Sequence, residues 1–210
     1  MIVAGVEEAG RGPVIGPMVM AICAIDKSKL YLLEEIGVKD SKMLSPKKRE
    51  ALISKIKEIC EVNVLILSPK IIDGALADPS MNLNWLEAKT SAKLINSVNC
   101  EKAILDCPSA NTLAYKNYVQ KLLKKEVQII SEHKADEKYV VVGAASIVAK
   151  VIRDKEIQKL RDKTGVDFGS GYPADPKTKE FLKENWDKFD FFRKSWKTYK
   201  KLANKKLGDF

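Results

Sequence analysis

Short apolar runs alternate with longer segments of helical periodicity along most of the chain. The run at residues 2–6, rich in Val and Ile, predicts a buried strand, and the apolar run from Pro17 to Ile25 predicts its hairpin partner. Further short apolar runs predict strands at 62–67, 102–105 and 127–130. Apolar residues at helical spacing predict helices at 47–60, 82–98, 111–124 and 139–161. This order predicts an α/β fold in which helices flank a mixed central sheet.

The chain changes character after the last of these helices. Glycine and proline are frequent at 164–176 and predict a loop. The basic segment that follows contains aromatic residues too densely for an exposed tail, so we predict a small helical subdomain there. The sequence is therefore divided into a main domain at 1–164, a helical subdomain at 165–203 and a flexible tail at 204–210.

Composition narrows the classes of partner. Lysine and arginine number 37 against 28 aspartates and glutamates, and the formal net charge of +9 favours a polyanionic partner such as nucleic acid. The four cysteines form no C-x-x-C pair and His133 is the single histidine, so neither a zinc site nor a disulfide framework is expected. No signal peptide or membrane-spanning run is recognisable, so we expect a cytoplasmic protein, and nothing indicates more than a monomer.

Acidic residues follow three of the predicted strands. Glu7 and Glu8 follow the first, and Asp106 and Asp136 follow two later ones. Taken singly, each position also fits an acidic strand end, a turn or the start of a helix. Taken together, acids at three strand ends can converge at one edge of a mixed sheet. Four carboxylates there could hold two Mg²⁺ or Mn²⁺ ions about 3.5–4 Å apart, which is the usual arrangement for phosphodiester hydrolysis.

A glycine-rich turn directly follows the first two acids. Gly10 and Gly12 allow unusual backbone angles and a close approach of a partner's backbone. Arg11 between them is a natural phosphate ligand. An ordinary tight turn after an acidic strand end is the alternative.

The segment from Glu7 to Gly12 resembles the D-E-A-G-R-G signature of type 2 ribonucleases H (RNase HII). The family's other motifs follow in the family's order as Asp40-Ser41-Lys42, Leu105-Asp106, His133 to Asp136, Ala144 to Lys150 and Gly169 to Pro173. The resemblance covers about residues 1–200, and archaeal members are similar in length and in lacking extra domains. It implies an RNase H-like fold with a small helical C-terminal part that binds substrate.

The resemblance also implies an activity. The expected enzyme is an endonuclease that hydrolyses the RNA strand of RNA–DNA hybrids, including single ribonucleotides embedded in duplex DNA. Cleavage is expected 5′ of the ribonucleotide, leaving a 3′-hydroxyl and a 5′-phosphate. The implied catalytic and metal-binding residues, acting with two divalent ions, are Glu7, Glu8, Asp106 and Asp136.

Substrate contacts are implied as well. The backbone from Gly10 through Arg11 to Gly12 is expected to read the 2′-hydroxyl, the feature that separates RNA from DNA at such a site. Lys42 is expected to contact a phosphate, and Tyr172 to lie against the deoxyribose that follows the ribonucleotide. A solvated lysine and a packing tyrosine are the alternatives at these two positions.

Position 7 departs from the family, which has aspartate where this chain has Glu7. The extra methylene moves the carboxylate by roughly 1–1.5 Å, and misplacement on that scale can cost about 10²-fold in rate. The hypothesis is that metal binding survives while turnover falls. The alternative function is a catalytically weakened nucleic-acid-binding protein on the same scaffold. A different RNase H-like enzyme, such as an exonuclease or resolvase, fits less well because the glycine turn and Tyr172 are present.

The last seven residues resemble the short peptide that docks on the replication sliding clamp. Asn204 stands where that peptide usually has Gln, the second aromatic is missing, and Leu207 and Phe210 are the apolar anchors. A frayed terminus is the alternative.

Overall fold

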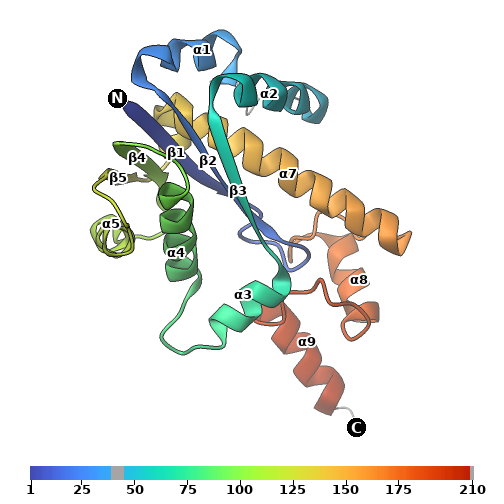
Figure 1. Ribbon diagram of the computed structural model, residues 1–210. Helices are drawn as coiled ribbons and strands as arrows, with labels where there is room; N and C mark the ends of the chain where they lie inside the picture. Colours follow the sequence, from blue (N-terminus) through green and yellow to red (C-terminus); the bar gives the residue numbers. More distant parts are fainter. Residues whose placement is uncertain (39–44, 209–210) are drawn as a thin grey trace. The chain divides into compact units, whose positions relative to one another are not determined.

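The central sheet is mixed and has five strands. The computed structural model describes residues 1–38 and 45–208, with the backbone alone at 46 and 206–208. The strand order is β3-β2-β1-β4-β5 (Figure 1). The strands are β1 (Ile2–Ala9), β2 (Met18–Asp26), β3 (Glu61–Leu67), β4 (Lys102–Asp106) and β5 (Gln128–Glu132). β1 pairs antiparallel with β2 and parallel with β4, and β4 pairs parallel with β5. The carboxyl ends of β1, β4 and β5 therefore lie at the same edge, and the predicted mixed sheet is confirmed.

The four predicted long helices are confirmed within a few residues at each end. They are α2 (Pro46–Ile59), α4 (Leu83–Asn96), α5 (Thr112–Lys121) and α7 (Val140–Thr164). The C-terminal region contributes α8 (Pro176–Asn185) and α9 (Lys197–Gly208). The sequence analysis missed a 3-10 turn (Lys27–Lys29), α1 (Leu30–Glu35), α3 (Pro69–Leu76) and α6 (Ala135–Lys138), which are short. In the described part of the chain, no helix combines the length and the apolarity that crossing a membrane requires.

Two helices begin with the same local signal. Ser45 precedes α2, and its hydroxyl accepts the Lys48 amide N–H at 3.4 Å. Ser68 precedes α3, and its hydroxyl accepts the Ile71 amide N–H at 3.3 Å. A proline follows each serine and takes the first helical position, where its missing N–H costs nothing. The second Ser-Pro pair is the signal that could have revealed α3.

Contacts divide the chain into two compact units. The first unit comprises Met1–Ala9, Val19–Leu65 and Asn84–Ile152, and the second comprises Gly10–Met18, Ile66–Leu83 and Arg153–Phe210. Each unit is built from separate segments of the chain, whereas the predicted division at residue 164 gives continuous segments. The difference arises because 10–18 and 66–83 pack with C-terminal residues that are remote in sequence. The functional division into 1–164 and 165–203 stays a prediction.

The core of the first unit lies between the sheet and two helices. Buried residues of β2, including Ala21 and Cys23, belong to one apolar cluster with Ile56 of α2 and Val148 of α7. The other face of the sheet is covered by α4 and α5 (Figure 1). Nearly every residue of β2 is buried, as expected of a strand covered on both faces.

Gly5 marks the closest approach of β1 to α7. A Cβ atom at this position would lie 2.5 Å from the carbonyl carbon and oxygen of Val141 and from the nitrogen of Val142. Since these are backbone atoms, neither element can yield without displacing the other. We expect Gly5→Ala to lower the free energy of unfolding by about 3 kcal/mol. The measurement is urea unfolding, with Gly74→Ala as the control. A Cβ at Gly74 in α3 meets nothing within 4 Å, so that change should be neutral or stabilising. Equal stability of both variants would contradict the proposed close approach.

The second unit has an aromatic core. Phe181 lies 5.6 Å from Phe168 and 5.9 Å from Phe192 between ring centroids, and Phe192 lies 6.1 Å from Tyr199. Phe168 and Phe192 are fully buried. The dense aromatic residues therefore form a packed core and not an exposed tail.

The segment predicted as a flexible tail begins within helix α9. Helix α9 continues through Asn204, whose side chain is exposed, and ends at Gly208. Lysine and alanine, which are frequent in this helix, are good helix formers. Phe210 lies outside the described residues.

Candidate active site

Glu7 and Glu8 lie near the carboxyl end of β1. They pair in register with Ala21 and Met20 of β2, while the parallel pairing with β4 ends at Val6. The two acids thus extend beyond the last residue pair that β1 shares with β4. Successive side chains of a strand alternate between its faces, so Glu7 and Glu8 can reach common ions only at the end of the strand, beyond its pairing with β4.

Asp106 and Asp136 are brought together by the loops that follow β4 and β5. Asp106 is the last residue of β4, and its Oδ1 accepts the amide N–H of Ala135 at 2.6 Å. Asp136 directly follows Ala135 and lies in the first turn of α6. His133 Nδ1 lies 2.9 Å from the carbonyl oxygen of Cys107, which is a second contact between the two loops. His133 therefore has a structural contact that the sequence did not indicate.

The acids act on one another electrostatically. The pKa of Glu7 is raised well above its ordinary value, first by burial and then by the negative charges of Glu8, Asp106 and Asp136. Lys150 of α7 opposes this rise. Its amine donates a hydrogen bond to the Ser146 hydroxyl at 2.8 Å. The structure thus gathers the four predicted acids at one edge of the sheet and adds a lysine for which the sequence predicted no role.

The donor set suits a hard divalent cation. Glu7 Oε2 is buried and has no hydrogen-bond partner in the described structure, and carboxylate oxygens are the ligands that Mg²⁺ and Mn²⁺ prefer. Among residues 1–38 and 45–208, no three Asp, Glu, His or Cys side chains stand close enough to form a ready-made metal site. Like charges repel, so carboxylates approach a common point only when a cation or a proton offsets that repulsion.

Because the pKa of Glu7 is raised, we expect the protein without metal to become less stable as pH rises. The pKa of Glu7 is raised above the ordinary 4.5, so above that pH the folded protein binds more protons than the unfolded chain. Stability should therefore fall as pH rises through the interval up to the raised pKa. We expect the unfolding temperature in EDTA to decrease over this interval, and Glu7→Gln to reduce the slope. Added Mg²⁺ should offset the decrease, since it binds the deprotonated acids. A wild-type slope equal to that of Glu7→Gln would exclude Glu7 as the cause.

The predicted substrate turn belongs to the second unit. Gly10 has a φ of +79°, in the left-handed region that glycine tolerates. A Cβ at Gly12 would lie 3.2 Å from Cε1 of Tyr172, so the turn and the predicted sugar-contacting tyrosine are neighbours. The Tyr172 side chain is 43% exposed, and the guanidinium carbon of Arg153 lies 5.9 Å from its ring centroid. The Tyr172 ring is thus partly exposed and lies near the Arg153 guanidinium, and its contact with the substrate stays a prediction.

Three predicted contact residues are not fully placed by the structure. Lys42 and Phe210 lie outside the described residues, and so does the side chain of Leu207. Their roles therefore stay predictions.

The sequence analysis missed the residues that hold the turn. Arg193 is fully buried and hydrogen-bonds to the carbonyl oxygens of Gly10, Arg11 and Gly16. Trp196 donates its indole N–H to the carbonyl of Gly12 at 2.9 Å. The signal was a lone arginine directly after two phenylalanines, because a charge in an apolar segment is buried only when hydrogen-bonded.

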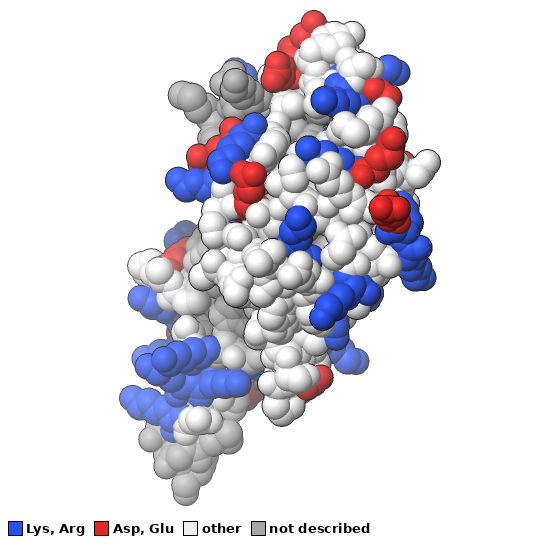
Figure 2. Space-filling model, turned by 90° about the vertical axis from the view of Figure 1, so that its left-hand side faces the viewer, with Lys and Arg blue, Asp and Glu red and all other residues white. Residues whose placement is uncertain are grey.

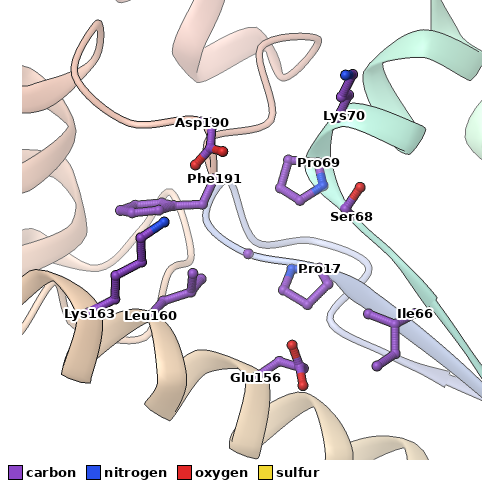
Figure 3. Close-up of a pocket in the computed structure, with 11 residues that line it drawn as sticks. Pro17, Ile66, Ser68, Pro69, Lys70, Glu156, Leu160, Lys163, Asp190 and Phe191 are labelled. Atoms are coloured by element: carbon purple, nitrogen blue, oxygen red, sulfur yellow. The ribbon is translucent and has the colours of Figure 1, made fainter.

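A cavity of about 370 Å³ lies elsewhere in the second unit. Figure 3 shows Pro17, Leu160 and Phe191 forming its apolar wall, with Lys163 and Asp190 at the edge. None of the predicted site residues lines this cavity. It therefore adds nothing to the candidate active site.

Basic side chains are widespread on the surface. On the face in Figure 2, several lysine and arginine side chains gather near the lower left of the view. The exposed lysines of α9 are Lys197, Lys200, Lys201 and Lys205. Such a surface suits a polyanion, in agreement with the net charge of +9.

Comparisons with known proteins identify the family. A model of the ribonuclease HII family matches residues 4–199. Ribonuclease HII of Methanococcus maripaludis is 48% identical over 210 residues, which cover 96% of this chain and 87% of that protein. The crystal structure of ribonuclease H2 from Pyrococcus horikoshii OT3 is 43% identical, covers 98% of each chain and superposes with a TM-score of 0.90. The structure of a PCNA:RNase HII complex from Archaeoglobus fulgidus matches with 40% identity and a TM-score of 0.86, covering 94% of this chain and 96% of that one.

These matches confirm the RNase H-like fold, and they span nearly the whole sequence. The archaeal sources of these relatives agree with the resemblance to archaeal members. The chain belongs to the ribonuclease HII family and is a ribonuclease H, an enzyme that hydrolyses the RNA strand of RNA–DNA hybrids.

Proposed function

We propose that this ribonuclease H also incises duplex DNA at single embedded ribonucleotides, using two divalent ions held by Glu7, Glu8, Asp106 and Asp136. The observation that carries the proposal is the buried Glu7 Oε2 near the end of β1, which has no hydrogen-bond partner in the described structure and lies within electrostatic reach of Glu8, Asp106 and Asp136. The family depends on divalent metal ions, and an all-carboxylate donor set fits Mg²⁺ or Mn²⁺.

Different residues of the chain have different roles in the proposed reaction. When bound, the divalent ions supply the positive charge that activates a water molecule and stabilises the leaving oxygen. Asp106, fixed by the Ala135 amide, holds its carboxylate at the end of β4. Lys150 offsets part of the negative charge on the Glu7 side. The turn from Gly10 to Gly12 selects the ribonucleotide through its 2′-hydroxyl.

The proposed cut breaks the bond between phosphorus and the 3′-oxygen on the 5′ side of the ribonucleotide. Water supplies the oxygen that joins phosphorus and the proton that the leaving 3′-oxygen takes up. The products are a 3′-hydroxyl upstream and a 5′-phosphate on the fragment that begins with the ribonucleotide. Tyr172 stacks against the following deoxyribose, and Lys42 contacts a phosphate.

The test is cleavage of a duplex with one ribonucleotide, beside an all-DNA duplex and a continuous RNA–DNA hybrid, in Mg²⁺ and separately in Mn²⁺. We expect cuts at the 5′ side of the ribonucleotide and none in all-DNA. Cleavage of the continuous hybrid alone would overturn the proposal of single-ribonucleotide incision. Binding of all three without cleavage would favour the weakened nucleic-acid-binding protein. Rising salt should weaken binding, because phosphate contacts release counterions.

A sliding clamp is the proposed protein partner. The related Archaeoglobus fulgidus enzyme was solved as a PCNA:RNase HII complex, and the last seven residues of this chain resemble a clamp-docking peptide. Asn204 is exposed on α9, which leaves this end accessible to a groove. We expect a purified archaeal sliding clamp to bind the full chain, and Phe210→Ala to weaken that binding at least about tenfold. Equal affinity of both would exclude the tail as the docking element.

A further inference from the structure

The turn proposed to read the 2′-hydroxyl is held from within by one buried arginine. Arg193 has no solvent exposure. Its Nη2 donates to the carbonyl oxygen of Gly10 at 2.6 Å and its Nη1 to that of Arg11 at 2.8 Å. Its Nε donates to the carbonyl of Gly16 at 2.9 Å. The planar guanidinium thus fixes three carbonyl oxygens in one geometry.

Trp196 extends this set of contacts to the next residue of the turn. Its indole Nε1 donates to the carbonyl oxygen of Gly12 at 2.9 Å. Its ring also lies against the guanidinium of Arg193, 4.7 Å from ring centroid to guanidinium carbon. Each side chain therefore positions the other as well as the turn.

The segment that carries these two side chains is anchored by Asp73 of α3. Asp73 Oδ2 accepts the amide N–H of Lys194 at 2.8 Å, and Oδ1 accepts the amide N–H of Ser195 at 2.9 Å. The Ser195 hydroxyl donates to Oδ1 at 2.5 Å. Arg193 is also fixed by its own amide, which donates to the carbonyl of Val14 at 2.8 Å. The bonds that the Asp73 carboxylate accepts are charge-assisted and therefore stronger than bonds between neutral groups.

The orientation of the carbonyls decides where the amides of the turn point. In a planar trans peptide the N–H lies opposite the C=O of the preceding residue. Because the carbonyls of Gly10 and Arg11 are directed at Arg193, the N–H groups of Arg11 and Gly12 are directed away from it. A rigid turn with outward N–H groups is preorganised for an oxygen ligand and loses little entropy when one binds.

We propose that Arg193, Trp196 and Asp73 are positioning residues that set the discrimination between RNA and DNA. This inference rests on the proposed function of the turn. In this proposal the three side chains act by fixing the backbone of the turn, through their hydrogen bonds to it and to one another's segment. Their removal should reduce the preference for a ribonucleotide, while general affinity for duplex DNA stays.

The test measures affinity for a duplex with one ribonucleotide and for an all-DNA duplex of the same sequence, with Ca²⁺ in place of Mg²⁺ and a gel check that nothing is cut. The variants are Arg193→Lys, Trp196→Phe and Asp73→Asn. Lysine retains the charge but cannot donate along three fixed directions, and phenylalanine retains the ring without the indole N–H. The control is Trp186→Phe, since the Trp186 ring packs on Tyr199 in the same core and, among the described residues, no side-chain hydrogen bond joins it to the turn.

We expect the ratio of the two affinities to fall about tenfold in each variant and to stay unchanged in Trp186→Phe. An unchanged ratio in the folded variants overturns the inference, and so does an equal loss of affinity for both duplexes, which marks a merely structural role. If Arg193→Lys fails to fold, Trp196→Phe and Asp73→Asn decide. A wild-type protein without any ribonucleotide preference refutes the proposed function itself, and the inference falls with it.

Discussion

Asp106→Asn is expected to lower kcat on RNA–DNA hybrids by on the order of 10³-fold, because one anionic ligand of the proposed metal site is lost. The fold should survive, since the amide oxygen of asparagine can still accept the hydrogen bond from Ala135. Without metal, the unfolding temperature should rise, because one of four mutually repelling charges is removed. Steady-state cleavage measures kcat, thermal unfolding in EDTA measures the unfolding temperature, and calorimetric titration of Mn²⁺ measures metal binding.

The matched control for this change is Asp187→Asn, at an exposed position of the second unit. It makes the same chemical change away from the proposed ligands, so neither cleavage nor metal binding should respond. Cleavage by Asp106→Asn at the wild-type rate would remove Asp106 from the proposed site. Loss of cleavage with undiminished Mn²⁺ binding would assign Asp106 a role other than metal ligation.

Glu7→Asp is expected to raise turnover by up to about 10²-fold, because it restores the shorter side chain that the family carries at this position. The glutamate carboxylate lies roughly 1–1.5 Å farther from the backbone, and Glu7 Oε2 is buried without a partner in the described structure. Metal affinity should change less than kcat, since a carboxylate is present in both proteins. Cleavage rates and Mn²⁺ affinities measured in parallel separate the two quantities.

Glu8→Asp provides the opposite control. It removes one methylene from the neighbouring acid. Since Glu8 already matches the family signature, this change should move its carboxylate away from the favourable position, and turnover should fall. Equal turnover before and after Glu7→Asp would refute the hypothesis that the longer side chain costs rate. Cleavage by Glu7→Asp alone, with none by the wild type, would instead support the weakened nucleic-acid-binding alternative.

The local parts of the fold were determined by the sequence. The apolar run at 2–6 predicted β1, and the spacing of apolar residues predicted α2, α4, α5 and α7. Periodicity reports which face of an element is buried, and this information is contained within the element itself. Short elements such as α6 were missed because one helical turn is too short to show a period.

The four acids were recognised in sequence for a similar reason. Glu7, Glu8 and Asp106 stand at strand ends, and parallel strands place their carboxyl ends at the same edge. Asp136 depended on more than the strand before it. The hydrogen bond between the Asp106 carboxylate and the Ala135 amide, together with the contact of His133 to Cys107, fixes its place.

Only the tertiary structure decided how the turn is held. Arg193 follows the turn by more than 180 residues, as its bond to Gly10 spans a sequence separation of 183. Sequence patterns show that a buried arginine needs acceptors, but they do not say which carbonyls supply them. The packing of 10–18 and 66–83 with the C-terminal residues in the second unit could not be predicted for the same reason. Burial pattern is a local property of the chain, whereas pairing between distant segments depends on the packing of the whole molecule.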